Sequence, residues 1–142
     1  MRIFIPITIL FVLMVACSNP TESNKGAGTI LNIYMPDSLK LPETVAYALV
    51  RAQVEDPDGL KDVKSVYFTS LKPDMTYGNN GNPILMYDNA TSGDEIGGDG
   101  IYSMGIQINS QNLVGRYLFT FEMEDKAGNL SAAVTDSIEV YE

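Results

Sequence analysis

The chain has 142 residues, with 18 acidic, 9 basic and no histidine residues, and its formal net charge is −9. Such a surface repels phosphate backbones and anionic lipid head groups, which argues against nucleic-acid binding and against adsorption to a membrane surface. With no histidine and Cys17 as the only cysteine, Ser/His/Asp, Cys/His and zinc chemistries are excluded. The length fits one domain of ordinary size.

The first sixteen residues have the layout of a secretory signal. Arg2 supplies a positive charge, residues 3–15 form an apolar run, and small residues precede Cys17. This run is shorter than the roughly 20 residues of a membrane-spanning helix, so a cleaved signal is the better interpretation. Residues 14–17, Met-Val-Ala-Cys, resemble the lipobox of bacterial lipoproteins, in which the cysteine is acylated and becomes the new N-terminus. The lipobox prefers Leu where Met14 stands.

This resemblance implies a lipoprotein that is cut before Cys17 and anchored in a membrane by diacylglyceryl and palmitate chains. Several acyl chains anchor a protein stably, whereas one does so only marginally. The alternative is an ordinary signal peptide with a cysteine at the cut by chance. Ser18 stands where Asp would mark retention in the inner membrane of enterobacteria, which favours the outer membrane. We expect a signal peptide over 1–16, a lipidated tether over 17–29 and a domain over 30–142.

Beyond this polar tether the chain alternates apolar and polar residues over short runs, which clusters of Gly, Pro, Asn and Asp separate. That pattern is typical of half-buried strands. We predict seven strands, over residues 30–35, 47–54, 63–71, 84–87, 102–108, 115–123 and 133–141. No segment has a convincing helical period.

Alternate positions within these strands carry the large apolar side chains and predict the hydrophobic core. The expected core residues are Val50, Ala52 and Val54; Tyr102, Met104, Ile106 and Ile108; Tyr117, Phe119, Phe121 and Met123; and Val134, Ile138 and Val140. Asp136 lies out of pattern on the core face of the last strand. We expect the role of all these apolar residues to be packing.

Seven short strands with a turn about every ten residues favour an all-β fold, a single antiparallel sandwich of two sheets. Three segments carry a resemblance: Asp-Pro-Asp-Gly at 56–59, Gly-Gly-Asp-Gly-Ile-Tyr-Ser at 97–103 and Asp-Lys-Ala-Gly-Asn at 125–129. Together they resemble extracytoplasmic Ig-like modules of bacterial surface proteins, over residues 45–142. The resemblance implies an immunoglobulin-like or fibronectin III-like architecture, without the Cys and Trp of antibody domains.

In such a sandwich the loops after the second, fourth and sixth of these strands leave at one end, so three Asp/Gly-rich segments should converge there. Carboxylates on glycine-bent backbone suit Ca²⁺, which takes about six to eight oxygen ligands. We therefore consider a calcium site made by Asp88, Asp94 and Asp99, with Asp56 or Asp125 as further ligands. The competing interpretation is structural, because Asp-Gly pairs are common turn formers. An EF-hand is not expected, since the loop connects strands.

The sequence supports two functions. The leading one is a lipid-anchored, non-catalytic module that contacts an envelope protein or glycan through its loops or a sheet face. Tyr67, Tyr77 and Tyr87 are candidates for this contact, or pack across strands instead. The alternative is a calcium-binding module for adhesion or stabilisation. An enzyme is least expected, because no pair of carboxylates stands out for glycosidase chemistry.

Overall fold

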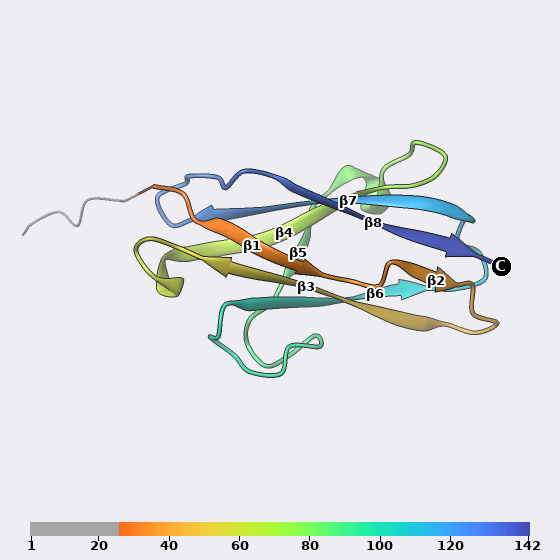
Figure 1. The fold of residues 1–142 in the computed structure, drawn as a ribbon, viewed down its shortest axis with the longest axis horizontal. Coiled ribbons are helices and arrows are strands. Elements are labelled where there is room, and N and C mark those ends of the chain that lie inside the picture. The colour runs from red at the N-terminus through yellow and green to blue at the C-terminus, as the bar shows by residue number, and fades with distance from the viewer. Residues whose placement is uncertain (1–25) are drawn as a thin grey trace, which may run out of the picture.

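A computed structural model describes residues 26–142; the predicted signal peptide and Cys17 lie outside the described residues. This part of the chain forms two β-sheets packed face to face (Figure 1). Its strands are β1 (Thr29–Tyr34), β2 (Ser38–Lys40), β3 (Ala46–Glu55), β4 (Val63–Leu71), β5 (Ile84–Met86), β6 (Ile101–Ile108), β7 (Gly115–Asp125) and β8 (Val134–Tyr141), with short 3₁₀ turns η1 (Leu60–Asp62) and η2 (Gly78–Gly81). Within residues 26–142 no helix is long and apolar enough to cross a membrane.

The topology is that of an Ig-like sandwich. One sheet has the order β1-β3-β6 and the other the order β2-β8-β7-β4-β5. The first corresponds to strands A, B and E of an immunoglobulin domain, and β4, β7 and β8 correspond to C, F and G. The predicted all-β, two-sheet fold is therefore confirmed. Its pairing is antiparallel except between β2 and β8, which run parallel.

All seven predicted strands are present, and their ends agree with the prediction to within two residues. The eighth strand, β2, is not predicted, because three residues between Pro36 and Pro42 are too few to show an alternation. β5 pairs with β4 at the edge of the five-stranded sheet. β6 is therefore the edge strand of the other sheet, where Ser103 forms a single bridge with Tyr87.

The core lies between the two sheets and is built largely from the predicted positions. Val50, Ala52, Val54, Ile108, Phe119, Phe121, Met123, Ile138 and Val140 are buried, and Tyr102, Met104, Ile106, Tyr117 and Val134 are partly buried against them. Phe68 of β4 completes the centre, with its ring centroid 5.7 Å from that of Phe119 and 5.5 Å from that of Phe121. Aromatic pairs at this separation contribute beyond the area they bury.

The chain enters the sandwich at one end, which we call the N-terminal end. Thr29 of β1 pairs with Glu55 at the end of β3. Gly28 is already buried against Met123, where a larger residue would collide, so ordered packing begins slightly before residue 30. The turns over residues 56–62 and 126–133 lie at this same end, since the backbone N–H of Lys126 donates to the carbonyl of Asp62 at 2.9 Å.

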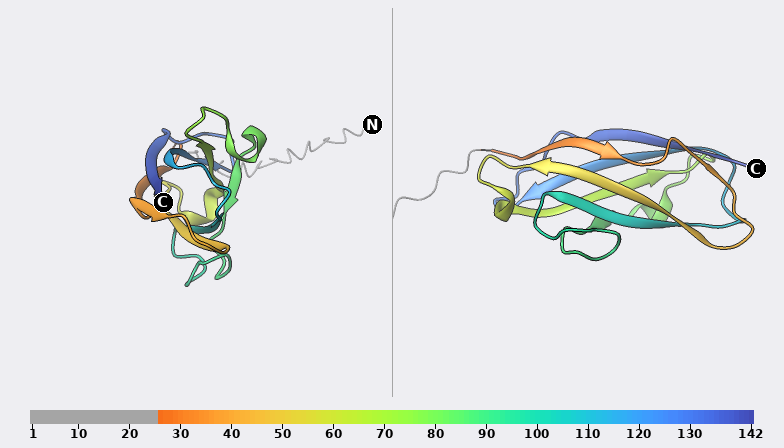
Figure 2. Two further views of the ribbon diagram at one scale, coloured as in Figure 1. Left: turned by 90° about the vertical axis from the view of Figure 1, so that its right-hand side faces the viewer. Right: turned by 60° about the horizontal axis from the view of Figure 1, so that its bottom comes forward.

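The opposite end, which we call the distal tip, is formed by the connections over 41–45, 72–77 and 109–114 and by the C-terminus (Figure 1). Strand register places these segments together: Ala46 pairs with Ile108, Lys40 with Tyr141, and Leu71 with Leu118. The molecule is elongated along the strands. The N-terminal end and the distal tip are therefore its two far ends (Figure 2).

Candidate functional site

Two groups of three carboxylates occur among residues 26–142. Asp88, Asp94 and Asp99 form one, and Asp56, Asp62 and Asp125 form the other; in each group one oxygen per residue lies within 4.8 Å of the others. The structure thus brings together the three principal predicted calcium ligands. It places Asp56 and Asp125 in the second group, with Asp62, which was not predicted as a ligand.

The three acidic segments form two groups because the loop over 88–100 does not project with the other two. It folds back over the outer face of the three-stranded sheet, alongside β3 and β6 (Figure 2). Glu95 forms a 2.7 Å ion pair with Arg51 of β3, and Gly93 lies against Leu49. Strand alternation places both β3 side chains on the outer face, where they give the loop a surface to pack on.

The first acidic group is tied into the loop by backbone amides. Asp88 accepts hydrogen bonds from the backbone N–H groups of Gly98, Asp99 at 3.3 Å and Gly100 at 2.9 Å. Asp94 accepts the N–H of Ala90 in the loop, and Asp99 accepts the N–H of Ile101 at the start of β6. This arrangement holds the carboxylates in place, as amide nests do around anions. These hydrogen bonds also fit the alternative interpretation of the loop, in which its Asp residues only stabilise turns.

Beneath this loop is a cavity of ≈ 200 Å³. Arg51, Asp94, Asp99 and Ser103 contribute to its walls. Ser103 is fully buried, and its Oγ has no hydrogen-bond partner within the described part of the chain. Ser103 was not predicted from the sequence, because its burial depends on the loop folding back, which strand patterning does not reveal.

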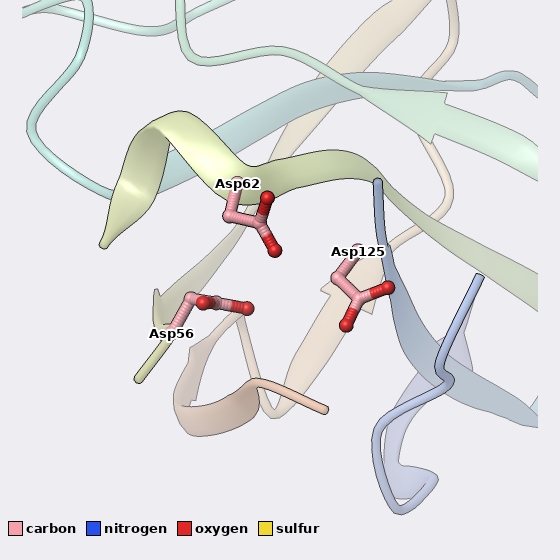
Figure 3. Close-up of side chains that lie close together, drawn as sticks. All are labelled: Asp56, Asp62 and Asp125. Atoms are coloured by element: carbon pink, nitrogen blue, oxygen red, sulfur yellow. The ribbon is translucent and has the colours of Figure 1, made fainter. Parts of the chain in front are cut away.

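The second acidic group joins the two turns at the N-terminal end (Figure 3). Asp56 follows β3, Asp62 ends η1 and Asp125 ends β7, and their side chains point toward one another. Asp125 is fully buried and accepts hydrogen bonds from the backbone N–H of Asn129 at 2.8 Å and from its Nδ2 at 2.7 Å. Asp56 accepts the N–H of Asp58 at 2.8 Å through Oδ1.

These carboxylates repel one another. Burial, followed by the charges of Asp56 and Asp125, raises the pKa of the Asp62 carboxyl, and only Lys126 acts in the opposite direction. A raised pKa means that the folded state binds the Asp62 proton more tightly than the unfolded state does. The charged form of Asp62 therefore lowers the stability of the fold. Asp62 was not predicted; its position just beyond the turn at Asp58-Gly59, on the other side from Asp56, is the sequence signal that could have identified it.

The candidate tyrosines are placed differently from one another. Tyr67 is half-buried on the outer face of the five-stranded sheet, where burial, then Glu122 and Glu124, raise the pKa of its hydroxyl. Tyr87 lies beside Ser103, with which it exchanges two backbone hydrogen bonds. Tyr77 is exposed at the distal tip, where it forms a bridge with Leu71 at the end of β4. Of the three, Tyr77 alone belongs to a larger cluster of exposed apolar residues.

We group these residues as the tip cluster, because they belong to segments that end at the distal tip. Its exposed large side chains are Val45, Tyr47, Met75, Tyr77, Leu113, Val114 and Tyr141. Tyr47 and Met75 are 71% and 73% exposed. Beside the tip, a cavity of ≈ 400 Å³ lies between the sheets, with Met104 and Ile108 among its walls, and extends to Lys72 and Asn112.

Comparison with known proteins gives a structural likeness only. No protein-family model matches the chain, and no curated protein matches it in sequence. Among solved structures, the chain is similar to the PKD domain of an M14-like peptidase from Thermoplasmatales archaeon SCGC AB-540-F20. The two are 11% identical, with a TM-score of 0.46, over 81% of this chain and 96% of that one. At this distance the likeness bears on neither ligand nor activity.

Proposed function

We propose that this chain is a lipid-anchored, non-catalytic module of the bacterial cell envelope, at the outer membrane, that binds a protein partner through its distal tip. The observation that carries the proposal is that exposed apolar and tyrosine side chains belong to the segments at the end of the sandwich farthest from where the chain enters. The lipobox-like segment ending at Cys17 supplies the anchor.

The position of the N-terminal end, opposite the distal tip, supports this arrangement. Residues 18–25 separate the proposed lipid on Cys17 from Gly26, and eight residues extend at most about 30 Å. A short tether attached to the N-terminal end leaves the distal tip as the part of the domain farthest from the lipid. The acidic turns around Asp56 and Asp125 are then on the membrane side, where their negative charge disfavours contact with anionic head groups.

The chemistry of the tip favours a protein partner over a glycan. Val45, Leu113 and Val114 offer apolar surface without the hydrogen-bonding groups that sugar hydroxyls need. Tyr47 and Tyr77 add aromatic side chains with a polar end, which are enriched where proteins meet. Concentrated exposed apolar surface is uncommon on soluble monomers and marks interaction sites. The neighbouring cavity between the sheets offers space for an apolar side chain of the partner.

Replacing Cys17 with Ser tests the anchor. We expect the variant to incorporate no labelled palmitate and to leave the outer-membrane fraction, because serine provides no thiol for acylation. Ser18→Ala, one residue further along, is the matched control and should keep both label and location. Labelling of Cys17→Ser at the level of the native protein would contradict the proposal.

Photo-crosslinking in intact cells tests the tip. A photoreactive residue at Tyr47 or Tyr77 should give a discrete protein adduct, because these side chains lie in the proposed interface. The control is the same residue at Leu130, which is 54% exposed but lies at the N-terminal end. Equal adducts from Leu130, or adducts removed by glycosidase and not by protease, would argue against a protein bound at the tip.

A further inference from the structure

We propose that Asp88, Asp94, Asp99 and Ser103 bind one Ca²⁺ ion, which fastens the loop over 88–100 to the outer face of the three-stranded sheet. The site lies beneath the loop, away from the distal tip, and is independent of partner binding there. Two separate observations carry it: the spacing of the three carboxylates and the unsatisfied hydroxyl of Ser103.

The spacing of the carboxylates fits a single ion. Oxygens bound to Ca²⁺ lie about 2.3–2.6 Å from it, so two oxygens on one ion are at most about 5 Å apart. One oxygen from each of Asp88, Asp94 and Asp99 meets this condition, since all three lie within 4.8 Å of one another. Carboxylates this close repel one another unless a cation or a proton lies between them.

Ser103 provides the second observation. It pairs with Arg51 in strand register, so both side chains lie on the outer face of the sheet, under the loop. Both line the same ≈ 200 Å³ cavity as Asp94 and Asp99. The Oγ of Ser103 is buried without a hydrogen-bond partner among residues 26–142, and burying an unpaired hydroxyl is costly. A cation at the wall formed by Asp94 and Asp99 would satisfy this oxygen together with their carboxylates, and Asp88 reaches it from beside them.

The donor set selects calcium. All four proposed side-chain ligands are hard oxygen donors, which suit Ca²⁺ or Mg²⁺ rather than transition metals. They lie on or beside an irregular loop, whereas Mg²⁺ demands near-ideal octahedral geometry. The positive charge of Arg51, which also lines the cavity, is directed to Glu95 at 2.7 Å. The amides that bind Asp88 hold its carboxylate in position before the ion arrives.

Calorimetric titration tests the proposal. The protein is the full mature chain carrying Cys17→Ser, freed of metal with chelator and titrated with CaCl₂. We expect one ion per chain and a rise in the melting temperature, because an ion that binds only the folded state stabilises it. Asp94→Asn should weaken binding at least tenfold. Asp62→Asn, in the other acidic group, should leave the affinity unchanged.

Ser103→Ala separates metal binding from a purely structural role. Alanine removes the unsatisfied hydroxyl, so the metal-free variant should melt no lower than the parent while its calcium affinity falls several-fold. Three results would overturn the site: no heat and no change in melting temperature at 10 mM CaCl₂, unchanged affinity in both Asp94→Asn and Ser103→Ala, or loss of binding in Asp62→Asn alone. Partner crosslinking at Tyr47 should persist in chelator. Failure of the calcium site can therefore be distinguished from failure of partner binding at the distal tip.

Discussion

Replacing Phe121 with Ala should lower the free energy of unfolding by about 3–5 kcal/mol, the largest single effect expected in this domain. Phe121 is fully buried at the centre of the core. Its ring centroid lies 5.5 Å from that of Phe68 and 6.4 Å from that of Phe119. The substitution removes these contacts and leaves a cavity that rigid strands on both sides cannot close. Urea denaturation of the full mature chain carrying Cys17→Ser, monitored by circular dichroism, measures the loss.

Leu118→Ala is the matched control for Phe121. Leu118 lies in the same strand, β7, but is 38% exposed on the opposite face. We expect its substitution to cost much less, because little apolar area is returned to water. If Leu118→Ala were as destabilising as Phe121→Ala, the assignment of the two faces of β7 would be wrong.

The placement of Phe121 and Leu118 on opposite faces of β7 also shows why the strands could be predicted from the sequence. Successive side chains of a strand point to opposite faces, so alternation along β7 identifies Phe119, Phe121 and Met123 as core without any knowledge of the partner strands. Pairing is a different matter. The pairing of β5 with β4 depends on contacts between separate segments of the chain. The sequence of residues 84–87 alone does not indicate which sheet edge they join.

The same distinction between local pattern and distant contact applies to the two acidic groups. Asp88, Asp94 and Asp99 belong to one continuous loop, so their proximity follows from local chain geometry and was expected. Asp56 and Asp125 lie apart from these three residues because the loop folds over the sheet. The ion pair between Arg51 and Glu95 helps to hold it there. Such a contact joins residues 44 positions apart. Neither composition nor spacing reveals it.

Asp125 should be the most important polar residue for stability. Asp125→Ala is expected to cost about 1–3 kcal/mol, because it removes two hydrogen bonds and each intramolecular hydrogen bond contributes about 0.5–1.5 kcal/mol net. The fully buried carboxylate accepts the N–H of Asn129 at 2.8 Å and its Nδ2 at 2.7 Å. Alanine leaves these donors without that acceptor and loosens the turn between β7 and β8. Thermal unfolding at pH 7 in chelator measures the effect.

Asp62→Asn, in the same acidic group, should act in the opposite direction. Burial and the nearby carboxylates raise the pKa of Asp62 in the folded state, so its protonated form stabilises the fold, and this contribution is lost as pH rises through the folded pKa. At pH 7 the variant should therefore melt higher than the parent, and the difference should shrink as the pH is lowered through that pKa. A gain in stability from Asp125→Ala at pH 7 would mean that repulsion within the group outweighs the hydrogen bonds to Asn129. Opposite signs for the two variants would establish that Asp125 stabilises the turn, while the charged form of Asp62 lowers the stability of the fold.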